Sequence, residues 1–472
     1  MQFTSIGAAL LAALCFVALV RPVWCIAFLP LAAVLQTHAL AIVSLGGVTH
    51  GVSLFNGMML FSGLQIFVLA ASKARAEAFS SAIRQPGFLL WALFALVSVV
   101  GALVLPMAFE GLPVIQMYGN ELLSQPFKPL KLNINHIAQS INTVGNVVCL
   151  FQVAFMSKIY GQKVALKVFA CGFVAAAVVS IAIAVYQRAF YFGMVPLDPT
   201  FWATNPSLIQ SFDSIYGEFL GFRRVSLPFI EPSYAGAWFA AGVAAMYTVA
   251  CLFRFNFLGI LGLFAFSGAL ANTFAATGML ALLLWFLGFV GILLGSLGYR
   301  MLRPPAAGAL VRTRSVLLCG ATILIFGGLF LASPSLQNAS KVIGSKIAEL
   351  RPDDAQQGFH RGDANKHALH LLYQTKGLGV GAGSNRTSGF LHGLLGNLGL
   401  LGTALFLTAL IYQVRKNILQ LRVVSTDAQR AIVAHLAALS CLLIAMVGGI
   451  ADQNWPVLWV LLIWGHLLSA SD

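Results

Sequence analysis

The sequence predicts an all-α, polytopic integral membrane protein with about 12–13 transmembrane helices. Three observations lead to this prediction: 59% of the 472 residues are hydrophobic, only 9% are charged, and long apolar runs recur along the chain. Soluble domains usually contain about 25% charged residues, so the composition excludes an ordinary soluble enzyme and a disordered chain. Each segment in lipid must satisfy its own backbone hydrogen bonds, and we therefore expect every span to be a helix.

Apolar runs bounded by charged or turn residues predict thirteen spans, or twelve if the two short runs at the start form one bent element. The first run lacks a basic n-region and a clear small-residue cleavage site, which favours a retained span over a signal peptide. We expect one transmembrane domain over residues 1–472. The predicted spans are 5–20, 22–36, 51–71, 87–108, 136–156, 168–187, 234–253, 256–275, 277–298, 315–332, 391–413, 431–449 and 455–469.

The basic residues predict the orientation of these spans. The formal net charge is +14, and one alternating set of connections carries sixteen of the 28 Lys and Arg residues with only three acids. By the positive-inside rule this set is cytoplasmic, so the charge gives no indication of nucleic-acid binding. The other side contains three long segments, 109–135, 188–233 and 333–390. Long polar connections often carry function, and the site is expected among them.

The second long segment ends in a group of charged residues at the start of a span. Arg223 and Arg224 precede Glu231, and Ser233 or Glu231 could cap the helix that begins here. Arginine is suited to bidentate phosphate recognition, and a helix amino terminus favours a nearby anion. The alternative is that both arginines only lie at the level of the lipid headgroups.

The third long segment contains a predicted amphipathic helix and a glycine-rich loop. Apolar residues at helical spacing follow Arg361, whereas glycines alternate over residues 377–383 and are followed by Arg386. The loop could bring backbone N–H groups close to an anionic ligand, or it could be a plain connection. His392 begins the next span, as either a catalytic or a buried structural histidine. No Cys or His pattern has metal-ligand spacing, so no metal and no cofactor are expected.

These motifs together resemble the O-antigen ligase and Wzy-type polysaccharide polymerase superfamily. An Arg stands eight residues before the Pro of a span-opening motif, from Arg224 to Pro232. A second Arg, Arg361, opens a helix that leads to the G-x-G-x-G loop at 379–383, and a Gly-Leu-Leu-Gly helix follows at 399–402. The resemblance covers roughly residues 215–415. It implies a bacterial inner-membrane glycosyltransferase whose long periplasmic loop, here 333–390, contributes to the site.

The resemblance implies a donor glycan on undecaprenyl diphosphate, a lipid-linked acceptor, and partners that include the bilayer and a chain-length regulator or export complex. Catalytic roles are expected for Arg224, Arg361 and Arg386 as a clamp on the diphosphate, and for Glu231, with His392 as the second candidate base. Substrate contacts are expected from Arg223, Ser233, Tyr234, Gly381, Gly383, Ser384, Asn385 and Ser388.

Two alternatives remain open beside a polymerase of exopolysaccharide or capsule repeat units. Ligases of this superfamily carry a His eleven residues before the Gly-x-x-Gly, where this chain has Ser388, and His392 lies one turn later. This difference favours polymerase over O-antigen ligase. A flippase or exporter of lipid-linked glycans would place charges within its spans, whereas nearly every charge here lies at a span end or in a connection.

Overall fold

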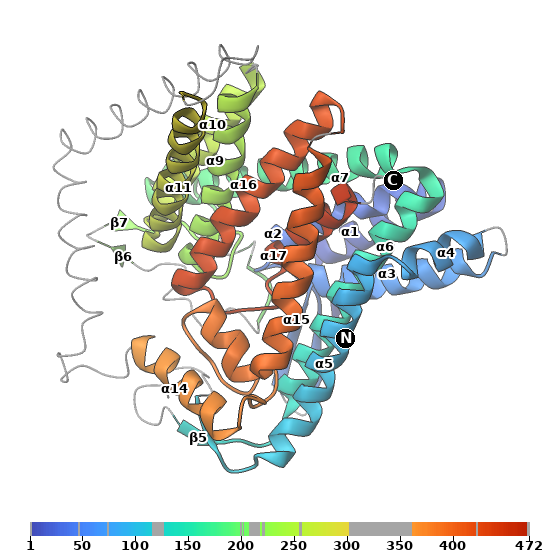
Figure 1. The fold of residues 1–472 in the computed structure, drawn as a ribbon, viewed down its shortest axis with the longest axis vertical. Coiled ribbons are helices and arrows are strands. Elements are labelled where there is room, and N and C mark those ends of the chain that lie inside the picture. Colours follow the sequence, from blue (N-terminus) through green and yellow to red (C-terminus); the bar gives the residue numbers. More distant parts are fainter. Residues whose placement is uncertain are drawn as a thin grey trace.

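The computed structural model of the chain is mostly helical (Figure 1). Residues 315–332, which include Cys319, and residues 333–360 of the predicted long loop lie outside the part that it describes. It describes residues 2–45, 48–72, 75–115, 127–198, 201, 203–206, 218–219, 222–253, 257–301, 361–421 and 423–469.

Six helices in the described part are long and apolar enough to cross a membrane. Each contains most or all of one predicted span, which confirms a mostly helical chain with helices of membrane-spanning length. They are α5 (Pro86–Ala108), α6 (Ile134–Tyr160), α7 (Gln162–Tyr191), α9 (Pro232–Leu252), α15 (Phe390–Gln420) and α16 (Thr426–Gly449).

Further apolar helices coincide with six more predicted spans, and two helices of different character lie between the spans. The apolar group is α1 (Ser5–Val20), α2 (Phe28–Val34) after a 3-10 helix at Pro22–Ala27, α3 (Leu54–Ala70), α10 (Phe257–Thr273), α11 (Ala276–Met301) and α17 (Pro456–Ser469). The other two are α4 (Ala76–Ile83) and α14 (Arg361–Gln374), the predicted amphipathic helix.

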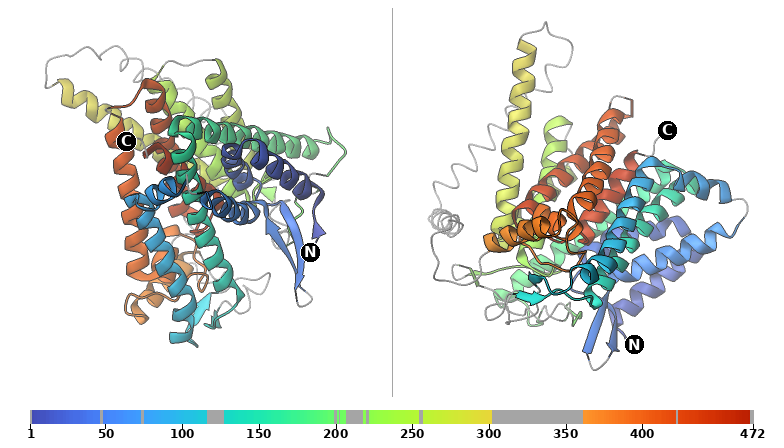
Figure 2. Two further views of the ribbon diagram at one scale, coloured as in Figure 1. Left: turned by 90° about the vertical axis from the view of Figure 1, so that its right-hand side faces the viewer. Right: turned by 60° about the horizontal axis from the view of Figure 1, so that its bottom comes forward.

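The prediction of helix throughout is wrong near the amino terminus. Strands β2 (Ala39–Leu45) and β3 (Val48–Ser53) pair antiparallel, and β1 (Gln2–Phe3) adds to β2. In both views of Figure 2 this hairpin projects beyond the helices. Cross-strand pairing satisfies its backbone groups in place of helical bonds, so residues 51–53 of the predicted span are strand.

Two shorter antiparallel pairs lie in the connections between spans. Strand β4 (Pro113–Ile115) pairs with β5 (Phe127–Pro129) between α5 and α6. Strand β6 (Glu218–Phe219) pairs with β7 (Phe222–Arg223) ahead of α9. Figure 1 shows β5 and α14 at the lower end of the bundle, beside the first turns of α15.

Helices α6 and α17 form the centre of the bundle. Almost every side chain of α17 is buried, and α6 is the most buried of the six long helices. An aromatic cluster joins α17 to the helices around it: Trp91 of α5 lies 5.3 Å from Phe406 of α15 and 5.2 Å from Trp459 of α17, between ring centroids. Edge-to-face pairs of this kind stabilise a core beyond the area they bury. This rigid centre positions the connections at the lower end.

Candidate active site

The amino terminus of α9 places a carboxylate at the edge of the bundle. Glu231 is the N-cap residue and Pro232 occupies the first helical position, where its missing N–H costs nothing. The predicted helix start is confirmed, with Glu231 at the cap position, but the Glu231 side chain makes no capping hydrogen bond. Instead, the Ser233 hydroxyl donates to Glu231 Oε2 over 3.1 Å. This bond orients the carboxylate beside the positive end of the helix.

Tyr234 connects this carboxylate with two charges from distant parts of the chain. Its ring packs edge-to-face on Trp455, with centroids 5.1 Å apart. The charges of Glu231, Asp452 and Arg386 all lie close enough to act on the Tyr234 hydroxyl. The start of α9 is therefore in contact with the segment that leads into α17, and the glycine-rich loop lies near enough for the Arg386 charge to act on both Tyr234 and Asp452.

Asp452 also belongs to this group, although it is not among the site residues that the sequence predicts. Burial raises the pKa of its carboxyl, while the Asn454 N–H and the nearby Arg386 charge oppose that rise. The same N–H donates to Asp452 Oδ1 over 2.9 Å. The neighbouring Asn454 Oδ1 accepts from Thr143 and Asn146 of α6, at 3.1 and 3.2 Å. The central helix thus fixes the turn that carries Asp452.

A local signal for this turn was present in the sequence. Asp452, Gln453 and Asn454 are three consecutive polar residues between two strongly apolar runs. Such a cluster at the end of a span has to satisfy its polar groups within the protein or face a polar site. Asp452 was nevertheless not predicted as a site residue, because no arginine and no glycine-rich motif stands beside it in the sequence. Its partners come from other segments.

Arg386 is exposed, but its backbone is held on both sides. Its N–H donates to Ile115 O over 2.9 Å, and the Ile115 N–H donates back to Asn385 Oδ1 over 2.9 Å. Asn385 is itself fixed by Asn397 of α15, whose amide bonds both its N–H and its carbonyl oxygen at 2.8 Å. The exposed Arg386 side chain is therefore carried by a firmly bonded stretch of backbone, in which Asn385 is the main support.

The glycines of the loop make room for the protein's own backbone. Gly381 has φ of +94°, and a Cβ there would lie 2.8 Å from Gly101 O of α5. Gly383 has φ of +85°, and its Cβ would lie 2.9 Å from Gln139 Cγ of α6. The Gly381 N–H donates to Asn397 O over 2.8 Å, so it is not available to a ligand. At Gly381 the close approach is to the protein and not to an anion.

Ser384 is likewise part of the loop's internal bonding. It is buried, and its hydroxyl donates to Val380 O. His136 Nε2 lies 2.9 Å from the same hydroxyl, and the Asn133 N–H donates to His136 Nδ1 over 3.0 Å. This network assigns the proton to Nε2 and makes Ser384 its acceptor. Ser384 thus joins the loop to the start of α6.

Replacing Gly381 by alanine is expected to destabilise the fold. A non-glycine residue at this φ costs about 1–3 kcal/mol, and the clash with Gly101 O adds to it. Gly111 is the matched control, because its φ is +88° but no atom lies within 4 Å of its Cβ position. Thermal unfolding in detergent should show a lower Tm for Gly381→Ala than for Gly111→Ala. Equal Tm values would show that the close packing at Gly381 contributes nothing.

The structure places Arg223 and Arg224 beside the end of α7. The Arg223 guanidinium lies 5.7 Å from the Tyr191 ring centroid, and the Tyr191 hydroxyl donates to Arg224 O over 3.4 Å. The Val225 N–H donates to Asn272 O at the end of α10. Both arginines are thus on the segment that leads into α9. Arg361 begins α14, and its side chain lies outside the described residues.

His392 and Ser388 lie where α14 meets the start of α15. Asn365 Oδ1 accepts the N–H groups of Ser388 and Gly389, both at 3.0 Å. His392 Nδ1 lies 3.0 Å from the position that a Cβ on Gly389 would take. The His392 ring therefore lies against the turn at residues 388–389, whose N–H groups bond to Asn365.

The group formed by Glu231, Tyr234, Arg386 and Asp452 combines one fixed cation with two carboxylates and a phenol. A guanidinium stabilises a developing phosphate charge, and a carboxylate of raised pKa accepts a proton at neutral pH. Within the described residues, no three His, Cys, Asp or Glu side chains gather in a way that could hold a metal ion. No protein-family model matches the sequence, and no curated protein matches it.

Proposed function

We propose that the protein is a membrane glycosyltransferase that polymerises oligosaccharide repeat units carried on undecaprenyl diphosphate. In this proposal it spans the bacterial inner membrane about 12–13 times, and the group around Tyr234 faces the periplasm together with the long loop 333–390. The product is a surface polysaccharide or exopolysaccharide. The observation that supports the proposal is that the charges of Arg386, Glu231 and Asp452 all act on Tyr234, in the first turn of a helix of membrane-spanning length.

The proposed reaction is the displacement of a lipid diphosphate by a sugar hydroxyl. The acceptor oxygen forms a bond to the anomeric carbon of the donor, and the bond from that carbon to the diphosphate oxygen breaks. Charge accumulates on the leaving diphosphate, where Arg386 stabilises it, with Arg224 and Arg361 as further members of the clamp. Preorganised charges of this kind are often the largest contribution to catalysis. No metal ion or cofactor is required in this scheme.

The acceptor hydroxyl gives its proton to a carboxylate of the same group. We assign this role to Asp452, because a base is most effective when its pKa lies near the working pH, and burial raises the pKa of Asp452 toward that range. Glu231, which Ser233 orients, is the second carboxylate and positions the guanidinium or the acceptor. His392, beside Gly389 at the start of α15, is a third candidate base.

The remaining predicted contacts divide into two groups. Tyr234, Ser233, Arg223 and Ser388 lie on the segments that surround the proposed site and are proposed to bind donor or acceptor. Gly381, Gly383, Ser384 and Asn385 act by holding the loop, since their contacts are with α5, α6, α15 and β4.

Purified protein in liposomes, supplied with lipid-linked repeat units, tests the proposal. Longer lipid-linked chains should form without translocation of the substrate across the bilayer. Translocation without elongation would instead support a flippase or exporter. Transfer to lipid A core, without elongation, would support a ligase. Neither of these outcomes is compatible with polymerisation.

A further inference from the structure

A basic basin lies at the opposite end of the bundle from the proposed active site. It is a cavity of about 600 Å³ formed by α4, the start of α5, the end of α6 and the end of α15. Helix α15 is kinked at Gly399, and Lys416 lies 17 residues beyond this kink, which at about 1.5 Å per residue corresponds to roughly 26 Å along the second part of the helix. The basin is lined by Glu77, Ser80, Ser81, Arg84, Gln85, Pro86, Lys158 and Lys416.

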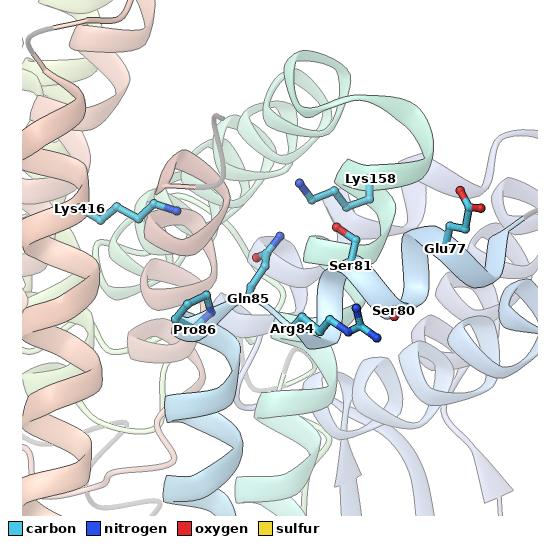
Figure 3. Close-up of a pocket in the computed structure, with 8 residues that line it drawn as sticks. All are labelled: Glu77, Ser80, Ser81, Arg84, Gln85, Pro86, Lys158 and Lys416. Atoms are coloured by element: carbon cyan, nitrogen blue, oxygen red, sulfur yellow. The ribbon is translucent and has the colours of Figure 1, made fainter.

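The cations of the basin come from three separate helical segments and share one cavity. Figure 3 shows Lys416 of α15 and Lys158 of α6 extending toward each other, with the amide of Gln85 between them. Arg84 adds a third positive charge, and Glu77 is the one acid in the lining. The lining is therefore positive overall. In Figure 3 the Arg84 guanidinium points away from the two lysines, so an anion in the basin would be bound chiefly between Lys158 and Lys416.

The hydrogen-bonding groups of the lining suit an oxyanion. The hydroxyls of Ser80 and Ser81 and the amide of Gln85 can donate beside the three cations. Gln85 is also the N-cap residue of α5, without a side-chain capping bond, so the positive end of that helix adds to the same field. Phosphate, with several acceptor oxygens and up to two negative charges, matches this combination.

Helix α4, which forms one side of the basin, packs an apolar face against the bundle. Phe79 of α4 packs edge-to-face on Phe151 and Phe155 of α6, with centroids 5.2 and 5.7 Å apart. The apolar face of this short helix is thus against the bundle, and Glu77, Ser81 and Arg84 are exposed. An amphipathic helix of this kind is typical of a membrane interface. The three helices that complete the basin all end or begin beside it.

We propose that this basin binds a phosphate group, carried either by an anionic phospholipid or by a soluble phosphate. Basic pockets between transmembrane helices on the cytoplasmic side commonly bind anionic headgroups, and the positive-inside prediction assigns these connections to that side. The proposal does not depend on the reaction at the other end of the bundle. Its ligand would contact α4, α6 and α15 at the same time.

Titration of purified protein in detergent with short-chain phosphatidylglycerol, with phosphatidylcholine and with inorganic phosphate tests the proposal. The test variant is Lys158→Gln/Lys416→Gln. The matched control is Lys163→Gln/Lys167→Gln, which removes two lysines of α7 that do not line the basin. We expect phosphatidylglycerol to bind more tightly than phosphatidylcholine, and the test variant to lose roughly tenfold to thirtyfold in affinity.

The three ligands distinguish the sources of the phosphate. Selective loss of phosphatidylglycerol binding in the test variant supports a lipid ligand. Binding of inorganic phosphate with the same dependence, and no preference for phosphatidylglycerol, supports a soluble one. Equal binding of both lipids without phosphate binding, or an equal loss in the control variant, would overturn the proposal. If the double variant does not fold, Lys158→Gln and Lys416→Gln are titrated singly, and binding unchanged in both overturns it as well.

Discussion

Replacing Arg386 by alanine is expected to reduce chain elongation by about 10²–10³-fold. The guanidinium is the cation that acts on both Tyr234 and Asp452, and in the proposed reaction it stabilises the departing diphosphate. Elongation of lipid-linked repeat units in liposomes measures the effect. The side chain is exposed and the backbone bond to Ile115 remains, so the amount of folded protein should not change.

The control for Arg386→Ala removes a cation from the same end of the bundle. Lys366 of α14 is highly exposed, with Nζ 4.0 Å from Asp363, and Lys366→Ala should leave elongation unchanged. Arg386→Lys should give an intermediate rate, because an ammonium keeps the charge but not the two-pronged geometry. Full activity of Arg386→Ala, with normal protein levels, would remove Arg386 from the reaction.

The fold was predictable from the sequence where hydropathy alone determines it. Apolar runs place helices such as α5 and α16 within a few residues of their observed bounds, because a long apolar segment has one stable form in lipid. The β2–β3 hairpin was not predicted, since β2 is also apolar and its pairing with β3 depends on contacts between strands. Hydrophobic periodicity cannot distinguish a helix from a strand in a short apolar segment.

The site was predictable only in part, for a related reason. Glu231 and Arg386 stand in local patterns, a charged helix start and a glycine-rich loop, that indicate chemistry within one stretch of sequence. Asp452 becomes part of the site through tertiary contacts, since Trp455 packs on Tyr234 and α6 holds Asn454. The loop glycines show the reverse: their pattern indicates close approach, but only the fold reveals that the approach is to α5 and α6.

Replacing Asp452 by asparagine is expected to abolish most of the activity and yet to stabilise the protein at neutral pH. Asp452 is the proposed general base, so its loss should lower the elongation rate by about 10²–10⁴-fold. The asparagine Oδ1 can still accept the Asn454 N–H, so the turn is preserved. Glu231→Gln is the comparison variant and should have a smaller effect, because Glu231 positions groups and does not take the proton.

The gain in stability follows from the pKa of the buried carboxyl. Burial raises this pKa above its usual 3.8, so the folded protein binds a proton here more readily than the unfolded chain. Stability therefore falls as the pH rises from about 4, the unfolded value, through the folded pKa, and above that the carboxylate destabilises the fold. Asparagine removes this titration. Thermal unfolding at pH 7 should give a Tm for Asp452→Asn equal to or above that of the unsubstituted protein.

The pH dependence of elongation separates a catalytic role of Asp452 from a structural one. A base acts only when it is deprotonated, so the rate should rise with pH through the raised pKa of Asp452 and level off above it. Residual activity of Asp452→Asn should lack this rising limb, whereas Glu231→Gln should retain it. If the limb persists in Asp452→Asn and disappears in Glu231→Gln, the proton goes to Glu231. A lower Tm together with lost activity in Asp452→Asn would instead indicate that the carboxylate serves the fold, which its unfavourable burial argues against.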